Sequence, residues 1–444
     1  MPSIKALELR ADIRRGVAAA ARLAQGESVR DVLDVRDPRA WLGLDAGARV
    51  DEFFCPPGVV PWERTAGGRE FSDVLRGSGP LTESQLALAL CHRDGRIRQA
   101  ALDRAAGHPV LLPLVVLRCA EWAPPVRDRA RQRLAEGLDA LTAGSLAPMI
   151  LLVGRRNRAD FAVRLLDETL RRAPRDRIVA LCAGPDRAVR RYAYSLAVED
   201  GLLSPAELAR AAARDTDTVV QTFCADAALA AVAKVGAYDE VYEPLLGARS
   251  PRVRSAGVTV LRPAGRAELA VGFLADRAPV VRACARYVVR QDGVDPLPVY
   301  RAWCATPEPV PGAVIGLAEC GGRADAELLW TLVGHPTGAV RARAVAGLRA
   351  LDVTDVRRLR PLLDDPAAGV VREVTAALLP SAELVPEEWL TERLGARWPR
   401  PVRVAAFRLL DARGGGVRRR AAEALLDDPD VKLRGWAEHA VKRG

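Results

Sequence analysis

A short motif recurs along most of this 444-residue chain: Val or Ile followed by Arg, usually just after Pro or Gly and just before a small residue. With the Arg as marker, the series is Arg98, Arg127, Arg190, Arg254, Arg282, Arg341, Arg372 and Arg403, and Lys432 closes it. The successive gaps are 29, 63, 64, 28, 59, 31, 31 and 29 residues, so the long gaps are about twice the short ones. We therefore expect degenerate markers inside the long gaps, at Arg158, Gln221 and near Ala313.

A period of roughly 30 residues predicts stacked pairs of helices, because one such pair cannot bury its apolar face without a neighbour. Two helices of about ten to twelve residues and two short turns fill this length. The composition is 49% hydrophobic but only 5% aromatic, which suits thin layers of closely packed helices. The predicted fold is an all-α solenoid, or superhelix, with about 12 helical hairpins over residues 81–444.

Residues 1–80 follow a different pattern. Apolar residues have helical spacing over residues 1–35, but the five aromatic residues from Trp41 to Phe71 lie among Pro and Gly residues, which interrupt helices. We expect an irregular N-terminal cap whose aromatic side chains cover the apolar end of the first repeat. The alternative is a binding loop with Phe53, Phe54 and Trp62 as aromatic anchors.

Two helix starts can be placed from their capping residues. Thr82 is followed three positions later by Gln85, and Ser204 by Glu207. This spacing lets two side chains satisfy free backbone donors at a helix start. We expect the first helix of a repeat to begin at each site.

One repeat carries a complete motif of the form D-x-x-P-x-V-R-x-x-A, at Asp276, Pro279, Val281, Arg282 and Ala285. In this motif the chain resembles the HEAT-like repeat proteins, and within them the short variety named for phycobilisome lyases. Most other repeats match the motif in part, over about 360 residues. The resemblance implies the fold and is nearly silent on activity, because one fold hosts many functions.

The resemblance also implies roles for particular residues. The marker Arg is expected to pair with an Asp near the same inter-helix turn, which forms a ladder along the stack. The acids placed for this role are Asp94, Asp186, Asp276, Asp365 and Asp428. A marker Arg committed to a carboxylate contributes little outward field, so we expect a structural role for the marker arginines rather than ligand binding.

The second helix of each pair usually lines the concave surface in such repeats. Its residues away from the ladder are the candidate partner-binding residues: Arg129, Arg131, Arg133, Arg191, Tyr192, Tyr194, Arg286, Tyr287 and Arg343. Arg beside Tyr suits a surface that holds phosphate and stacks a base. The same pair is enriched in protein interfaces, and a solvated face or core edge is the third interpretation.

Charge favours the early repeats for any anionic partner. Residues 91–220 carry 22 basic and 16 acidic residues, a net charge of +6 within the total of +10. Of the 66 basic residues 62 are Arg, which a GC-rich genome explains, so the abundance of Arg is weak evidence for nucleic acid.

No catalytic residue, cofactor or metal ligand is predicted. None of the four His residues precedes Glu, which excludes the iron-binding hydroxylases of similar repeats, and no residue indicates a tetrapyrrole site. The eight Trp residues are scattered, so none can be matched to the site of the alkylpurine DNA glycosylases. The cysteines form no C-x-x-C pair and are expected to be reduced core residues.

The chain lacks a secretion signal and any run of 18 apolar residues, so we expect a soluble cytoplasmic protein without membrane contact. The favoured function is a noncatalytic scaffold or adaptor that binds a protein or peptide on its concave face. The alternative is a nucleic-acid-binding protein that uses the basic early repeats, with a DNA-repair glycosylase as its enzymatic extreme. The oligomeric state is left open.

Overall fold

The computed structural model describes residues 4–50, 61–76 and 79–443. Helices make up 73% of the chain, and no β-strand occurs in these ranges, which confirms the all-α prediction. Contacts divide the chain into two compact units, Met1–Ser204 and Pro205–Gly444, and each is described by itself. This division does not test the predicted boundary near residue 80, because that boundary separates an irregular cap from helical repeats and not two compact units. The boundary stays a prediction. Phe53 and Phe54 lie outside the described residues.

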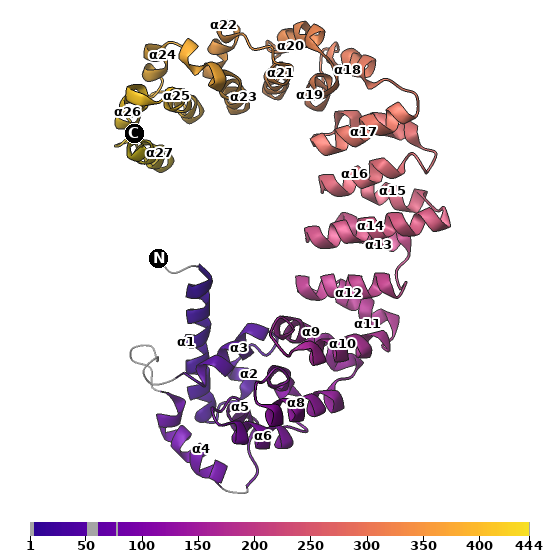
Figure 1. The fold of residues 1–444 in the computed structure, drawn as a ribbon, viewed down its shortest axis with the longest axis vertical. Helices are drawn as coiled ribbons and strands as arrows, with labels where there is room; N and C mark the ends of the chain where they lie inside the picture. Colours follow the sequence, from indigo (N-terminus) through magenta and orange to yellow (C-terminus); the bar gives the residue numbers. More distant parts are fainter. Residues whose placement is uncertain (1–3, 51–60, 77–78, 444) are drawn as a thin grey trace. The chain divides into compact units, whose positions relative to one another are not determined.

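The first unit consists of helices that pack on their neighbours in the sequence (Figure 1). They are α1 (Ile4–Ala24), α2 (Val29–Val32), α3 (Pro38–Gly47), η2 (Trp62–Arg64), α4 (Ala66–Arg76), α5 (Glu83–Leu90), α6 (Gly95–Arg104), η3 (Pro109–Leu111), α7 (Leu112–Arg118), α8 (Pro124–Gly137), α9 (Ala140–Val153), α10 (Asp160–Arg171), α11 (Arg175–Cys182) and α12 (Arg187–Glu199). Four helix pairs follow one another among the described residues: α5 with α6, α7 with α8, α9 with α10, and α11 with α12. One cluster of buried side chains connects them, from Ala19 on α1 to Ala197 on α12.

The predicted capping residues of α5 are confirmed. Thr82 accepts a hydrogen bond from the Gln85 N–H, and the Gln85 side chain accepts one from the Thr82 N–H. The helix predicted after Ser204 begins at Pro205 as α13.

The N-terminal aromatic segment contributes to the core of the first unit. Trp62 is 2% exposed, and its Nε1 donates to the carbonyl of Ala48 at 3.0 Å. Its ring lies 5.7 Å from that of Phe71, which is also buried. A ring held in this way is not available as an exposed anchor, so the anchor prediction is wrong for Trp62. Burial of these rings supports the capping interpretation of the segment.

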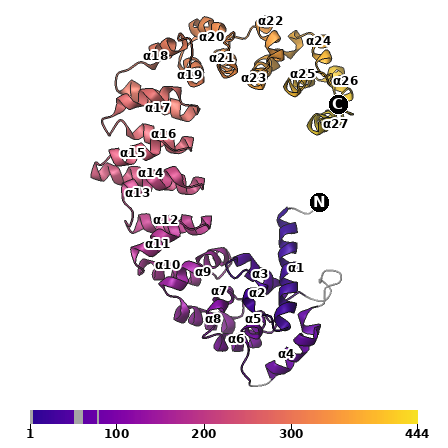
Figure 2. The same ribbon diagram turned by 180° about the vertical axis from the view of Figure 1, so that it is seen from behind.

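The second unit continues the pattern of paired helices. Its elements are α13 (Pro205–Arg214), α14 (Thr218–Val235), α15 (Asp239–Leu246), α16 (Pro251–Val260), η4 (Ala267–Ala275), α17 (Pro279–Gln291), α18 (Pro296–Cys304), α19 (Pro311–Cys320), η5 (Arg323–Asp325), α20 (Ala326–Leu332), α21 (Gly338–Ala350), α22 (Val356–Leu359), η6 (Arg360–Asp364), α23 (Ala368–Leu378), η7 (Leu379–Leu384), α24 (Glu387–Glu392), α25 (Arg400–Arg413), α26 (Gly415–Glu423) and α27 (Val431–Arg443). The second helices of the pairs are α14, α16, α17, α19, α21, α23, α25 and α27. Three of them, α14, α16 and α17, lie side by side in both views (Figures 1 and 2).

Seven arginines at the marker position have the same local role, whereas Arg403 donates from Nε to the carbonyl of Leu394. Arg254 shows the pattern: its Nη1 donates to the carbonyl of Ala248 at 2.8 Å and to that of Arg249 at 2.9 Å, six and five residues earlier. Equivalent bonds are made by Arg98, Arg127, Arg190, Arg282, Arg341 and Arg434. These carbonyls lie where the first helix has ended and lack helical partners, so a cation there satisfies and stabilises them.

The acid of the predicted ladder comes from the following turn, not from the same one. Arg254 binds Asp276 through two parallel bonds, Nε to Oδ2 and Nη2 to Oδ1, both of 2.9 Å. The corresponding pairs are Arg98 with Glu121, Arg341 with Asp365, and Arg403 with Asp428. Asp94 and Asp186 instead accept backbone N–H groups at the starts of their own helices. The prediction is therefore corrected: each acid fastens the preceding repeat or caps a helix.

Three predicted markers do not occupy the marker position. Val371, 1% exposed, takes it in α23, and the side chain of the adjacent Arg372 is 69% exposed. In α27 the position belongs to Arg434, whereas Lys432 is exposed. Arg158 lies in the turn before α10 with a φ of 68°. A shift of one or two residues moves a side chain from the turn to another face of the helix.

Of the two other degenerate markers, Gln221 occupies the marker position, and Ala313 lies next to it, one residue before Val314. Gln221 on α14 donates from Nε2 to the carbonyl of Asp215 at 2.6 Å, across the same six residues as a marker Arg. Ala313 is buried on α19, where small residues allow a close approach to the paired helix. A Cβ atom at Gly316 would lie 2.3 Å from the ring of Tyr300 on α18.

One helix in the described ranges, α14, is long and apolar enough to cross a membrane by length and composition alone. A packed helix of a soluble protein meets the same criteria. Helix α14 packs against α13, α15 and α16, and it begins at Asp217, whose carboxylate accepts the N–H groups of Val219 and Val220. In this span 28% of the residues are buried, so α14 packs on its neighbours with one face and leaves another face exposed.

Candidate functional site

The second helices expose a regular set of positions in the second unit. On α14, Val220 and Cys224 are buried, whereas Val219 and Phe223 are 49% and 37% exposed. The marker position of α14 is Gln221. Phe223 lies two residues after it, and Val219 lies one helical turn before Phe223. Because an α-helix repeats every 3.6 residues, these positions share one outward face of the helix. We call this the second-helix face and define it by these positions.

Two further second helices expose large side chains on this face. On α17, Val280 is 47% and Tyr287 is 53% exposed. On α27, Trp436 is 42% exposed, two residues after Arg434, as Phe223 is two residues after Gln221. Exposed aromatic side chains of this kind are typical anchors in protein interfaces.

A groove lies between α14 and the start of α16. It encloses about 640 Å³ and is lined on α14 by Thr218, Val219, Gln221, Thr222, Phe223 and Asp226, and on the α16 side by Ser250 and Arg252. Three hydroxyl groups, a carboxylate and a guanidinium surround the apolar side chains of Val219 and Phe223. The groove is thus apolar at its centre and can recognise polar groups at its edges.

A second groove also lies between the second helices of two neighbouring pairs. It encloses about 370 Å³ between α25 and α27, with Phe407, Arg408 and Asp411 on one side and Trp436 and His439 on the other. Both grooves therefore separate second helices of neighbouring pairs in the second unit, and both combine an exposed aromatic ring with an acid and an Arg.

The three predicted arginines of α8 are committed to contacts within the first unit. Arg129 and Arg133 both reach Asp103 on α6: Arg129 Nε binds its carboxylate, and Arg133 Nη2 donates to its carbonyl at 3.1 Å. Arg131 Nη2 donates to the carbonyl of Arg158 at 2.9 Å, and its guanidinium lies 5.3 Å from the ring centroid of Phe161. These side chains fasten α8 to neighbouring helices.

The predicted residues of α12 lie on another part of the same unit. Tyr192 donates to Asp167 Oδ1 on α10 at 3.0 Å, and burial together with this bond raises the pKa of its hydroxyl. Arg191 is exposed and Tyr194 is half-buried. The phenol of Tyr192 therefore holds α12 to α10 and is not free to stack a base.

The predicted partner-binding residues of the second unit differ: one is held by a contact within the unit, and two are exposed to solvent. Arg286 Nη1 binds Glu319 Oε2 at 2.6 Å, and Arg282 contacts the same carboxylate, with Nε 3.0 Å from Oε2. Burial opposes the charge of Arg286, but its bonds to Tyr300 and Glu319 outweigh this and raise its pKa. Tyr287 and Arg343 are exposed, on α17 and α21 respectively.

Sequence reasoning missed the apolar residues of the grooves, Val219, Phe223 and Trp436, because it searched the second helices for Arg and Tyr. The signal that could have found them is their fixed offset from the marker position. Phe223 and Trp436 stand two residues after it, and Val219 stands two residues before it.

Two buried cysteines of the described residues have weakly acidic thiols. Burial raises the pKa of the Cys119 and Cys304 thiols to about 12, so both stay protonated near neutral pH. Within residues 4–50, 61–76 and 79–443, no group of three or more His, Cys, Asp or Glu side chains is placed to hold a metal ion.

Comparison with known proteins adds no assignment. No family model matches the chain, and no curated protein matches it significantly.

Proposed function

We propose that this protein is a noncatalytic scaffold, a solenoid of short HEAT-like repeats that binds a protein or peptide partner. The second-helix face of the second unit is the binding surface, and the groove between α14 and α16 is its main contact. The observation that carries this proposal is the exposure of Val219 and Phe223 beside a groove of about 640 Å³.

The size and chemistry of the groove support this partner class. Its volume lies within the range of about 300 to 1,000 Å³ that suits a compact ligand, or the apolar side chains of a peptide. Phe223 offers a ring to such side chains, while Asp226 and Arg252 can bind charges on the peptide. An apolar centre with a polar rim is the usual anatomy of a protein interface.

The contacts of the predicted arginines favour a protein over nucleic acid. Arg129 and Arg133 share Asp103, and Arg286 shares Glu319 with Arg282. A guanidinium beside a carboxylate contributes little to the field that attracts phosphate. Of the predicted arginines of the early repeats, Arg129 and Arg133 are thus held by Asp103 within the first unit.

Site-specific photo-crosslinking in native lysate tests the surface directly. A photoreactive amino acid replaces Phe223 in the full chain, and the control places it at Glu243, which is exposed on α15, the first helix of the next pair. We expect adducts to a defined peptide segment at position 223 and none at position 243. Equal labelling at both positions, or no protein adduct at position 223, would contradict the proposal.

A pair of matched variants gives the second measurement. Phe223→Asp places a charge in the groove, and Val294→Asp places one at a similarly exposed residue outside it, since the two side chains are 37% and 38% exposed. Capture of the crosslinked partner should be lost in the first variant and kept in the second. Duplex and single-stranded DNA at low salt should give no change in fluorescence anisotropy. Salt-sensitive DNA binding would support the nucleic-acid alternative instead.

A further inference from the structure

The groove between α25 and α27 contains a cation that no carboxylate of the unit neutralises. Arg408 and His439 line it, both are exposed, and neither forms a hydrogen bond or ion pair within residues 4–50, 61–76 and 79–443. The carboxylate in the lining belongs to Asp411, and Arg418 Nε lies 3.0 Å from its Oδ1. An anion that enters the groove can therefore bind Arg408 without displacing a carboxylate from it.

Helix α27 adds a second cation beside its exposed ring. Lys432, Trp436 and His439 follow one another at intervals of four and three residues, so they share one face of the helix. Lys432 is exposed, and Trp436 is 42% exposed. Asp430, the acid nearest to Lys432 in the sequence, is bound by Arg400. This face thus presents an ammonium group and an imidazole on either side of an aromatic ring.

A glycine keeps the groove open. Gly435 lines it, and a Cβ atom there would meet no atom within 4 Å. Glycine is unfavourable inside a helix because of its conformational freedom, and packing does not require it at this position. Its missing side chain leaves room beside Trp436 for a side chain of a partner. Phe407, only 4% exposed, gives this space an apolar floor.

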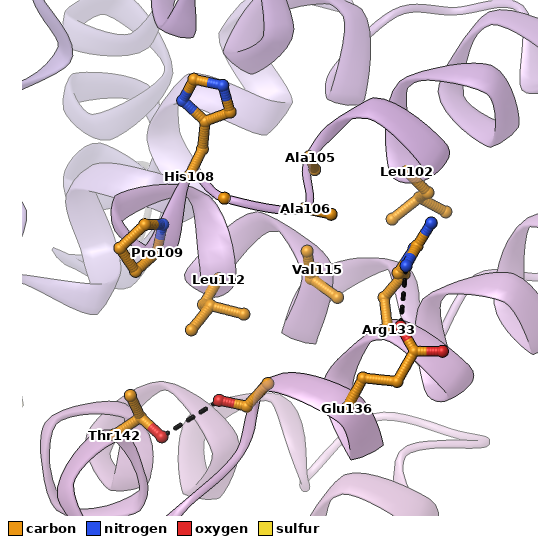
Figure 3. A pocket seen from close by; sticks show the side chains of 12 residues that line it. Leu102, Ala105, Ala106, His108, Pro109, Leu112, Val115, Arg133, Glu136 and Thr142 are labelled. Atoms are coloured by element: carbon orange, nitrogen blue, oxygen red, sulfur yellow. Dashed lines mark hydrogen bonds and ion pairs between the residues drawn. The ribbon is translucent and has the colours of Figure 1, made fainter.

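The cavity of the first unit has the opposite arrangement. It encloses about 300 Å³, and its polar side chains are already paired (Figure 3). Arg133 Nη1 donates to Glu136 Oε2 at 2.7 Å, and the Thr142 hydroxyl donates to the carbonyl of Gly137 at 3.2 Å. That cavity therefore offers no unpaired cation, whereas the groove between α25 and α27 does.

The charges of the second unit favour a peptide over a nucleic acid at this groove. Asp226 is exposed in the groove between α14 and α16, on the same second-helix face. Glu438 is exposed on α27, two residues after Trp436 and therefore on another side of that helix. A continuous phosphate backbone along the second-helix face would meet the charge of Asp226, whereas a peptide carries carboxylates at only some of its positions.

We propose that the groove between α25 and α27 binds an acidic peptide segment, with a carboxylate on Arg408 and an aromatic side chain on Trp436. A second carboxylate of the segment meets Lys432. The proposal rests on the scaffold function described above and specifies the chemistry of the partner. The volume of about 370 Å³ suits one large side chain of the peptide and the acidic residue next to it.

NMR of the full chain tests the groove through the indole N–H signal of Trp436, which is identified by its loss in Trp436→Phe. The probes are capped seven-residue peptides with the central sequence Glu-Phe-Glu, Gln-Phe-Gln or Glu-Ala-Glu. The first should shift the signal. The second should bind about ten-fold more weakly, because a carboxylate bonds a guanidinium more strongly than an amide does. The third lacks the ring and should bind about five-fold more weakly.

Two variants and one control locate the contact. Arg408→Gln should remove most of the preference for Glu-Phe-Glu over Gln-Phe-Gln, whereas Arg290→Gln, at an exposed Arg on α17, should keep it. Gly435→Leu fills the groove and replaces glycine with a good helix former, so it should fold and should abolish the shift. Circular dichroism checks the fold of all three proteins.

Three results with the peptides would overturn the proposal. They are an unchanged Trp436 signal with Glu-Phe-Glu, equal affinity for Gln-Phe-Gln, and full binding by folded Gly435→Leu. A stronger response to a single-stranded oligothymidylate than to Glu-Phe-Glu would assign the groove to nucleic acid and would also overturn it.

The crosslinks at position 223 separate this proposal from the scaffold function. Crosslinks without peptide shifts at Trp436 would overturn the acidic-peptide groove alone. Peptide shifts without crosslinks would contradict the main contact proposed between α14 and α16 and would leave the groove between α25 and α27 as a binding site.

Discussion

Arg341 and Asp365 are joined by two parallel hydrogen bonds, 2.8 Å from Nε to Oδ2 and 2.7 Å from Nη2 to Oδ1. The same guanidinium donates from Nη1 to the carbonyls of His335 and Pro336, each at 2.8 Å. One side chain therefore fastens the turn before its own helix and the turn of the following pair. Such a planar fork suits Arg and cannot be reproduced by Lys.

Removal of Arg341 should destabilise the protein strongly. Arg341→Met would leave the Asp365 side chain, 5% exposed, without its cation, and we expect a loss of about 3 kcal/mol in the free energy of unfolding. Arg372→Met is the matched control, because that side chain is 69% exposed, and it should cost less than about 1 kcal/mol. Urea unfolding followed by circular dichroism measures both. Equal losses would show that Arg341 has no special structural role.

The assignment of the last marker can be tested at the C-terminal helix. Arg434 Nη1 donates to the carbonyl of Asp428, whereas Lys432 is exposed. We expect Arg434→Ala to cost about 1 to 2 kcal/mol and Lys432→Ala less than about 0.5 kcal/mol. Limited proteolysis should cleave α26 and α27 faster in the first variant only. Faster cleavage in the Lys432 variant would restore the assignment made from the sequence.

The helix pair of α18 and α19, whose second helix has no marker Arg, should depend on Gly316 for its close packing. A Cβ atom there would lie 2.3 Å from Cε1 of Tyr300, whose hydroxyl donates to the buried carbonyl of Leu274 at 2.7 Å. The ring cannot move without loss of this bond, so Gly316→Ala should cost about 2 kcal/mol. Gly322→Ala, which meets no atom within 4 Å, should be nearly neutral. Thermal unfolding compares them, and equal melting temperatures would refute the close approach.

Acid should weaken the second unit through Asp325. The hydrogen bond from Arg301 Nε to Asp325 Oδ1, 2.6 Å long, lowers the pKa of this carboxyl. Its stabilising effect is thus fully present above the unfolded-state pKa of about 3.9 and is lost as the pH falls through the lower folded-state pKa. Asp325→Asn should be less stable at pH 7 and should decline less steeply between about pH 5 and pH 2.

Asp352→Asn is the control for the acid experiment, because Asp352 forms an ion pair with Arg323 in which both side chains are well exposed, by 92% and 73%. Its pH profile should match that of the unchanged protein. If Asp325→Asn retained the full acid sensitivity, the lowered pKa of Asp325 would not be the cause.

The outward residues of the second helices show why the candidate site was only partly predictable. The period of the motif indicated which helices are second in each pair, and it drew attention to Tyr287, which is exposed. It could not show that Arg129 and Arg133 share Asp103, because that contact joins α8 to another helix pair. Exposure of Phe223 likewise depends on how closely the next second helix approaches it.

The sequence by itself determined the helix pairs, their period and most of the marker positions, because local turn chemistry and apolar spacing act over a few residues of the same segment. Gln221 shows this, since it makes the bond of a marker Arg across the same six residues. Only the tertiary structure decided which acid each marker Arg binds, as with Arg254 and Asp276. Such a bond forms only if two successive turns lie close together, and the sequence of one repeat does not determine the distance between them. The same reason applies to the grooves and the cavity, which exist only where neighbouring pairs leave space between them.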